Sequence, residues 1–188
     1  MSKILFINAC VREQSRTLKL AQYVLEQLGG EVEEVKLDEV ELFPLDREGI
    51  ELRERACRNN DFSSPVFDLA KQFAKAETVI VAAPYWDLMF PASLKTYIET
   101  ITINNLTFTY GEKGIPQGLC KCNKLIYVTT SGGPIHFNFG YDYISTVAKA
   151  FYGVKEVQCV KAEGLDIHGA DVNAIIEKAK DSFYQNNL

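Results

Sequence analysis

The sequence lacks several features that would place it in a common class of proteins. Its apolar stretch around Val79 to Pro84 is far shorter than the roughly 20 residues that a membrane-spanning helix needs. The first residues lack the charged and then apolar pattern of a signal peptide, so we expect a cytoplasmic protein. The 20 basic residues are outnumbered by 25 acidic residues, and this balance argues against nucleic acid as a partner.

Motifs for metals, nucleotides and hydrolysis are also missing. The chain has only 2 histidines, and its 5 cysteines include no C-x-x-C pair, so we expect reduced thiols and no metal site. Neither G-x-G-x-x-G nor the Walker A pattern occurs, which argues against Rossmann-type dinucleotide binding and against nucleoside triphosphates. No paired carboxylates or Ser-His-Asp set is evident, and we therefore assign no catalytic side chain.

What the sequence does contain is a regular alternation of strand and helix patterns. With 188 residues, 47% of them apolar, the chain suffices for one domain with a sizeable core. Apolar runs and alternation predict strands at 3–9, 31–37, 77–83, 124–130 and 154–162. Helical spacing predicts helices at 18–28, 65–75, 91–101, 141–152 and 172–183. The predicted buried face of the second helix consists of Val66, Leu69, Ala70, Phe73 and Ala74.

This alternation predicts an α/β fold in a single domain over residues 1–188. We expect a doubly wound, five-stranded parallel sheet with helices on both faces, which is the strand count of a flavodoxin-like domain. We interpret 38–63 as a polar surface excursion with some helix, and 106–118 as a loop. Ligands of such sheets bind beyond the carboxyl ends of the strands, so the candidate site comprises the strand exits at 9–17, 84–90 and 130–139.

The first exit combines arginines with hydroxyl side chains just before a predicted helix. Helix N-terminal amides favour an anion; Ser15 or Thr17 can donate to a phosphate, and Arg12 can pair with its charge. The alternative is that Ser15 only caps the helix and that the arginines lie in solvent.

The other two exits are rich in aromatic and small residues respectively. The second exit places Tyr85, Trp86 and Phe90 in a loop that begins at Pro84, and such a loop either covers core or flanks a flat ligand such as a flavin. The third exit, Thr130-Ser131-Gly132-Gly133, is either a plain turn or a backbone that a ligand can approach closely. Because the three strand ends are neighbours, the signals together indicate one binding site.

The sequence resembles the FMN-dependent NADH-azoreductases, within the flavodoxin-like family of NAD(P)H:quinone oxidoreductases. The resemblance rests on an A-P-x-W-x-x-x-x-P-x-x-L-K block within Ala82–Glu99, and on Leu106–Tyr110, Thr130–Gly133 and Ala162–Gly164. It implies an enzyme that transfers a hydride from NADH or NADPH through FMN to a quinone or azo compound in a ping-pong reaction. It also implies a homodimer with FMN at the subunit interface, where Phe108, Tyr110 and Phe151 would shape a wall.

The same resemblance implies roles for individual residues. Arg12, Ser15 and Thr17 would hold the FMN phosphate, and Pro84, Tyr85, Trp86, Asp87 and Phe90 would surround the ring. Thr130, Ser131, Gly132 and Gly133 would contact its pyrimidine side. The chain departs from the family at Asp87, where Asn is usual, and at Ser131, where Arg is frequent.

Some alternatives stay open at this point. His136 either assists protonation of the acceptor or is a loop residue near the mouth of the site. A flavodoxin-type FMN electron carrier that serves partner proteins is the main alternative function, although its phosphate loop would be expected to lack arginine. A flavin-free binding protein with the same fold is the third.

Overall fold

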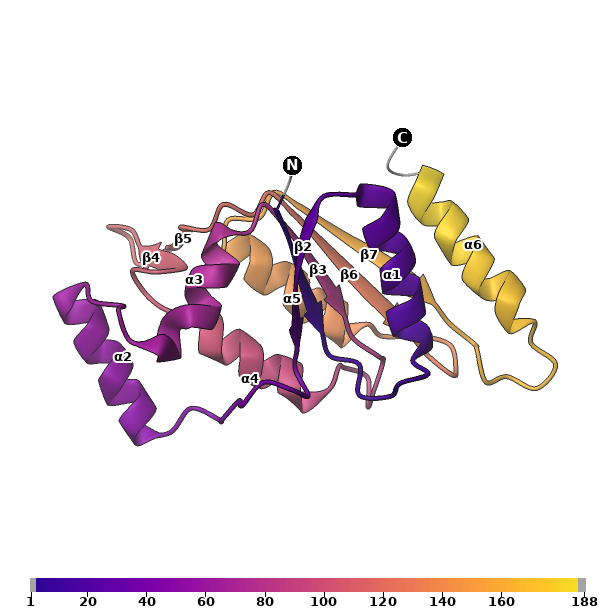
Figure 1. The fold of residues 1–188 in the computed structure, drawn as a ribbon, viewed down its shortest axis with the longest axis horizontal. Coiled ribbons are helices and arrows are strands. Elements are labelled where there is room, and N and C mark those ends of the chain that lie inside the picture. Colours follow the sequence, from indigo (N-terminus) through magenta and orange to yellow (C-terminus); the bar gives the residue numbers. More distant parts are fainter. Residues whose placement is uncertain (1–2, 186–188) are drawn as a thin grey trace.

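The computed structural model describes residues 3–185 and has a five-stranded parallel sheet at its centre (Figure 1). The strand order is β2-β1-β3-β6-β7. The bounds are β1 Lys3–Asn8, β2 Glu31–Lys36, β3 Thr78–Ala82, β6 Lys124–Thr130 and β7 Glu156–Ala162. This arrangement confirms the predicted flavodoxin-like fold, and the order is that of the doubly wound flavodoxin type.

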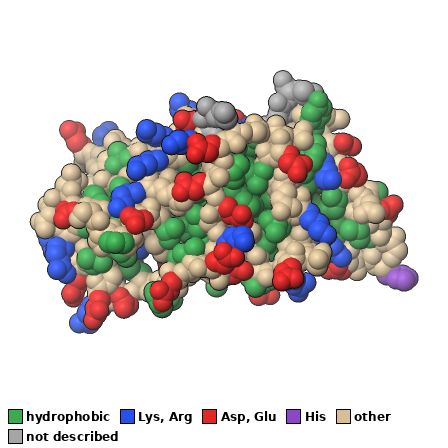
Figure 2. Space-filling view, in the orientation of Figure 1, with side chains coloured by type: hydrophobic (Ala, Val, Ile, Leu, Met, Phe, Trp, Pro, Cys, Tyr) green, Lys and Arg blue, Asp and Glu red, His purple; other side chains and the backbone are tan. Residues whose placement is uncertain are grey.

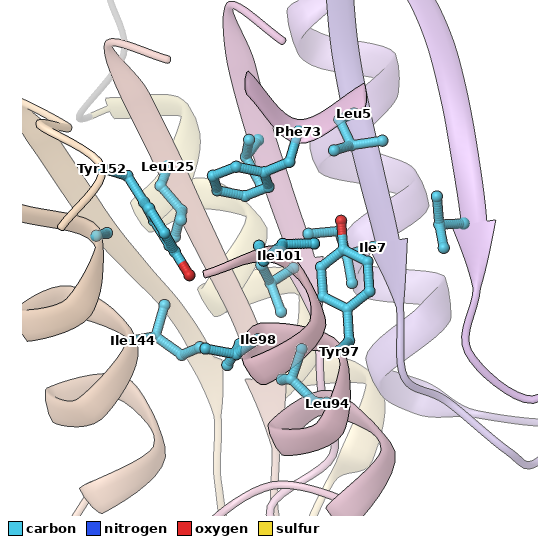
Figure 3. Close-up of a cluster of buried hydrophobic side chains, with 14 of the residues drawn as sticks. Leu5, Ile7, Phe73, Leu94, Tyr97, Ile98, Ile101, Leu125, Ile144 and Tyr152 are labelled. Carbon is cyan, nitrogen blue, oxygen red and sulfur yellow. The ribbon is translucent and has the colours of Figure 1, made fainter. Parts of the chain in front are cut away.

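Helices cover both faces of this sheet. The helices are α1 Arg16–Leu28, α2 Arg47–Asn59, α3 Asp68–Lys75, α4 Ala92–Ile101, α5 Phe139–Ala150 and α6 Val172–Gln185. Helices α1 and α6 lie on one face, and α3, α4 and α5 lie on the other (Figure 1). Because successive strand residues point to opposite faces, Ile4 and Phe6 pack with α1, whereas Leu5 and Ile7 belong to the cluster in Figure 3. Burial on both faces explains why β1, β3 and β6 are almost continuously apolar, whereas the edge strand β2 is largely exposed and polar.

Two peripheral segments differ in how well the sequence predicted them. The excursion after β2 holds α2 as expected, and Ala56 is the residue of that helix that is buried. The prediction of a loop at 106–118 is wrong, because β4 (Phe108–Tyr110) and β5 (Pro116–Gly118) form an antiparallel hairpin there. Strands of three residues are too short to show a period of two in the sequence.

The predicted buried position of Val66 is also wrong, since this side chain is 51% exposed. Residues Pro65–Phe67 form a 3-10 turn before α3 and bury Phe67 instead. The tighter turn shifts the helical register assumed from the sequence.

The surface carries charges of both signs. Figure 2 shows acidic and basic side chains interspersed over one face of the molecule. Within residues 3–185, no helix is long and apolar enough to span a bilayer.

Candidate functional site

The three predicted exits leave adjacent strands. Asn8 of β1 lies opposite Ala82 of β3, and Ala82 lies opposite Val128 of β6. Strand β2 lies on one side of β1 in the sheet, and β3 lies on the other side. The order of connection therefore reverses at β1, and a topological switch point lies between β1 and β3. Such a point opens a crevice for ligands beyond the strand ends.

The first exit ends in a capped helix. The hydroxyl oxygen of Ser15 accepts the amide of Leu18 at 3.2 Å, so Ser15 caps α1. The amides of Arg16 and Thr17 lie in the first turn, where no preceding helical carbonyl can accept them. Arg12 is exposed in the turn just before the helix, and its carbonyl accepts the Ser15 amide at 3.1 Å. Free first-turn amides beside a cation suit an anion, because the helix dipole adds partial positive charge there.

A pair of buried hydroxyls joins the first exit to the third. The hydroxyl oxygens of Thr17 and Thr130 are 2.7 Å apart, and both residues are buried. The side chain of Thr17 therefore holds the first exit against the third, whereas its backbone amide stays in the first turn of α1.

The second exit is a tight hairpin. Trp86 and Met89 exchange two backbone hydrogen bonds of 3.1 and 2.8 Å around Asp87 and Leu88. Both turn residues have positive φ, 49° and 68°, as a type I′ turn requires. Aspartate tolerates this conformation, whereas leucine adopts it at a cost in strain. Asp87 is exposed at the tip of this hairpin.

The aromatic residues of the second exit fall into two groups, one buried and one accessible. Phe90 is buried, and its ring centroid lies 5.9 Å from that of Tyr143. Trp86 is 41% exposed, whereas Pro84 and Tyr85 are half-buried. The loop therefore covers core at its end and presents flat apolar groups at its start.

Tyr85 connects the second exit to the third through two hydrogen bonds. Its amide donates to the carbonyl of Thr130 at 3.1 Å. Its hydroxyl donates to the carbonyl of Phe137 at 2.8 Å. Thr130 thereby contacts both other exits, and the structure brings all three together.

The third exit is supported by the loop 163–166 that follows β7. Three backbone hydrogen bonds of 2.9–3.1 Å run from this loop to the third exit, donated by Gly164, Leu165 and Asp166 to the carbonyls of Gly133, Ser131 and Gly132 respectively. A methyl group at Gly132 would collide with the carboxylate of Asp166, whereas space around Gly133 is open. Gly132 thus serves packing, and Gly133 leaves backbone accessible to a ligand.

An ion pair joins the supporting loop to the first exit. Arg16 Nη1 lies 2.7 Å from Asp166 Oδ1 and donates to the carbonyl of Leu165 at 3.3 Å. Asp166 belongs to none of the motifs found in the sequence. The two partners are 150 positions apart, and no local pattern indicates such a contact.

Glu163 holds the far end of the third exit. Its Oε2 accepts the amide of Ile135 at 2.9 Å, and Lys161 lies nearby. The hydrogen bond from Ile135 and the charge of Lys161 lower the pKa of this carboxyl below its usual range. His136 is exposed beside it in the loop.

The donor set of these exits fits FMN. Helix-end amides and Arg12 suit a phosphate, the aromatic hairpin suits a flat ring, and accessible backbone at Gly133 suits polar ring atoms. Among residues 3–185, no group of three or more histidine, cysteine or acidic side chains is placed to hold a metal ion.

Comparisons with known proteins agree with this geometry. A family model for the flavodoxin-like fold matches residues 2–186. An FMN-dependent NADH:quinone oxidoreductase 2 of Clostridium acetobutylicum is 34% identical, covering 96% of this chain and 98% of that protein. An FMN-dependent NADH:quinone oxidoreductase of Coprothermobacter proteolyticus is 31% identical, over 95% and 94%. The crystal structure of an azoreductase from Bacillus anthracis superposes with a TM-score of 0.83 at 25% identity, over 99% and 98%.

The fold, the strand order and the matches along nearly the whole chain agree with the resemblance noted in the sequence. The chain belongs to the flavodoxin-like family and, within it, to the family of FMN-dependent NADH:quinone oxidoreductases.

Proposed function

We propose that this protein is an FMN-dependent oxidoreductase that transfers a hydride from NADH or NADPH to a quinone or an azo compound. One observation carries the proposal: a helix end suited to an anion, an aromatic hairpin and an accessible glycine loop meet at three adjacent strand ends. The activities named for the curated relatives and for the azoreductase structure support the choice of substrates.

Each exit has a distinct task in this proposal. Arg12 and the α1 end, with Ser15 and Thr17, hold the phosphate, since amides and a guanidinium bind its charge. The hairpin from Pro84 to Phe90 covers the ring, with the backbone of Tyr85, Trp86 and Asp87 at its polar edge. The pyrimidine side of the ring is lined by the third exit, at Thr130, Ser131, Gly132 and Gly133.

Bound FMN supplies the redox chemistry, which protein side chains cannot perform themselves. The residues of the exits orient the two substrates, which use one site in turn in a ping-pong order. Each turnover moves two electrons and one proton as hydride, and the reduced quinone takes its second proton from solvent. No acid–base side chain is therefore required.

Assembly and location are further parts of the proposal. We infer a homodimer with the flavin sites at the interface, where the exposed ring of Tyr110 and the edge-to-face pair of Phe108 and Phe151 would form a wall. The protein would act in the cytoplasm, where a reducing environment keeps free thiols such as Cys10 and Cys122 reduced. Sedimentation of the holoprotein and cell fractionation test these two points.

The direct test is the absorption spectrum of purified protein during anaerobic additions. We expect flavin bands near ~450 nm that bleach with NADH and return with benzoquinone. A flavin that NADH does not reduce would favour the partner-dependent electron carrier. A colourless protein that FMN cannot reconstitute would contradict the flavoenzyme proposal.

A substitution tests the phosphate site separately. Arg12→Ala should weaken FMN binding about ten-fold and leave riboflavin binding unchanged, because a charge-assisted contact to phosphate is lost. Arg55→Ala, an exposed arginine on α2, is the matched control. Equal losses for FMN and riboflavin would place Arg12 outside the phosphate site.

A further inference from the structure

Two exposed aromatic rings at the end of the third exit have no task in the proposed function. Phe137 and Phe139 lie almost parallel, with ring centroids 5.6 Å apart and 9° between their planes. Phe137 is 60% exposed and Phe139 is 47% exposed. Single exposed apolar residues need no explanation, but an exposed, ordered aromatic pair next to a candidate site is typical of a binding surface.

The pair adjoins the aromatic hairpin. The carbonyl of Phe137 accepts the hydroxyl of Tyr85, so its backbone touches a residue of the proposed ring site. The next hairpin residue, Trp86, is also exposed. Flat apolar side chains from two exits are therefore accessible at the same edge of the sheet.

The segment that carries the pair is fixed at both ends. Ile135 donates its amide to Glu163 on one side of the pair. Asn138 lies between the two phenylalanines, and its side chain accepts the amide of Tyr141, beyond the pair, at 3.1 Å and so caps α5. A surface that is already ordered loses little conformational entropy when a ligand binds.

We propose that Phe137 and Phe139 determine specificity for the electron acceptor by binding the outer rings of acceptors with two or more aromatic rings. The proposal rests on the proposed function, which supplies planar aromatic acceptors. Aromatic side chains bind such rings by stacking or edge-to-face contacts. An acceptor with one ring would be held in the reaction site alone and would not extend to the pair.

The chain offers a direct probe of binding, because Trp86 is its single tryptophan. Its fluorescence reports ligands at the hairpin in the oxidised holoprotein and in flavin-free protein.

In the variant F137L/F139L, we expect a naphthoquinone sulfonate to bind about three- to ten-fold more weakly, since apolar bulk remains but the flat faces are lost. Benzoquinone binding should be unchanged, and F137Y/F139Y should bind like wild type. Tyr184→Leu, at a 49% exposed aromatic on α6, is the control.

Kinetics separate specificity from a general defect. The KM for the two-ring acceptor should rise in F137L/F139L, with kcat, flavin content and reduction by NADH all unchanged. Equal effects on both acceptors, or no effect on either, would overturn the proposal. So would a change in oligomeric state, because the pair would then be a contact between copies. If flavin binding or NADH reduction fails in wild type, the proposed function fails, whereas the tryptophan titration still decides whether the pair binds aromatic rings.

Discussion

The second and third strand exits carry adjoining parts of the candidate site, yet they are held in place differently. The hairpin of the second exit is closed by its own two hydrogen bonds between Trp86 and Met89. The third exit takes its support from the loop 163–166, and the bond from Ile135 to Glu163 spans 28 positions. The hairpin is therefore determined by local geometry, whereas the third exit depends on tertiary contacts.

This difference indicates where the site is most easily disturbed. Thr130 contacts both other exits, through its hydroxyl to Thr17 and through its carbonyl to Tyr85. A change at Thr130 should therefore disturb the tertiary connection directly. A change at the hairpin tip should remain local.

The largest effect is expected from Thr130→Val, which removes one hydroxyl of the buried pair. Thr17 would keep a buried hydroxyl without its partner, and the free energy of unfolding should fall by about 1–3 kcal/mol. Urea denaturation measures this change. Thr146→Val, at an exposed threonine of α5, is the control. In T17V/T130V the loss should be smaller than the sum of the single losses; additive losses would show that the two hydroxyls do not interact.

A smaller change of opposite sign is expected from Leu88→Gly in the hairpin. The positive φ of 68° at Leu88 costs nothing for glycine, so the variant should gain about 0.5–1 kcal/mol despite its more flexible unfolded chain. Thermal unfolding measures the gain. Leu45→Gly is the matched control, because Leu45 is similarly exposed and its φ is not among the positive values. A destabilised L88G variant would contradict the assignment of strain to this turn.

The sequence predicted the features that depend on local contacts better than those that depend on distant ones. Apolar runs and their alternation predicted the five strands, and a cap by Ser15 was one of the two interpretations of the first exit; the structure contains that cap. The role of Asp166 could not be predicted, because its partners are Arg16 and Gly132, which lie far away in the chain. The positive φ at Leu88 was equally hidden, since leucine gives no signal for such a turn.

Glu163→Gln tests the support of the third exit through its pH dependence. The pKa of Glu163 is lowered in the folded protein, so its charged form stabilises the fold above the ordinary glutamate range and this contribution disappears as pH falls through the lowered pKa. Wild type should therefore be slightly more stable than E163Q at about pH 7, and the difference should vanish at about pH 3. Urea denaturation at both pH values checks this. A constant difference would mean that the charge is not involved. Glu177→Gln, an exposed partner of Lys180, is the control.

The smallest single effect is expected from Asp166→Ala. Its ion pair with Arg16 is exposed, with 42% and 68% of the arginine and aspartate side chains accessible, so the loss in unfolding free energy should be below about 1 kcal/mol and decrease with salt. A substitution at Gly132 tests the packing of Asp166 against the third exit, apart from its ion pair. Gly132→Ala places a methyl group against the Asp166 carboxylate and should destabilise wild type more than the D166A variant. Equal costs of G132A in both backgrounds would show that Asp166 does not pack on the third exit, and the loop 163–166 would then support it through backbone hydrogen bonds alone.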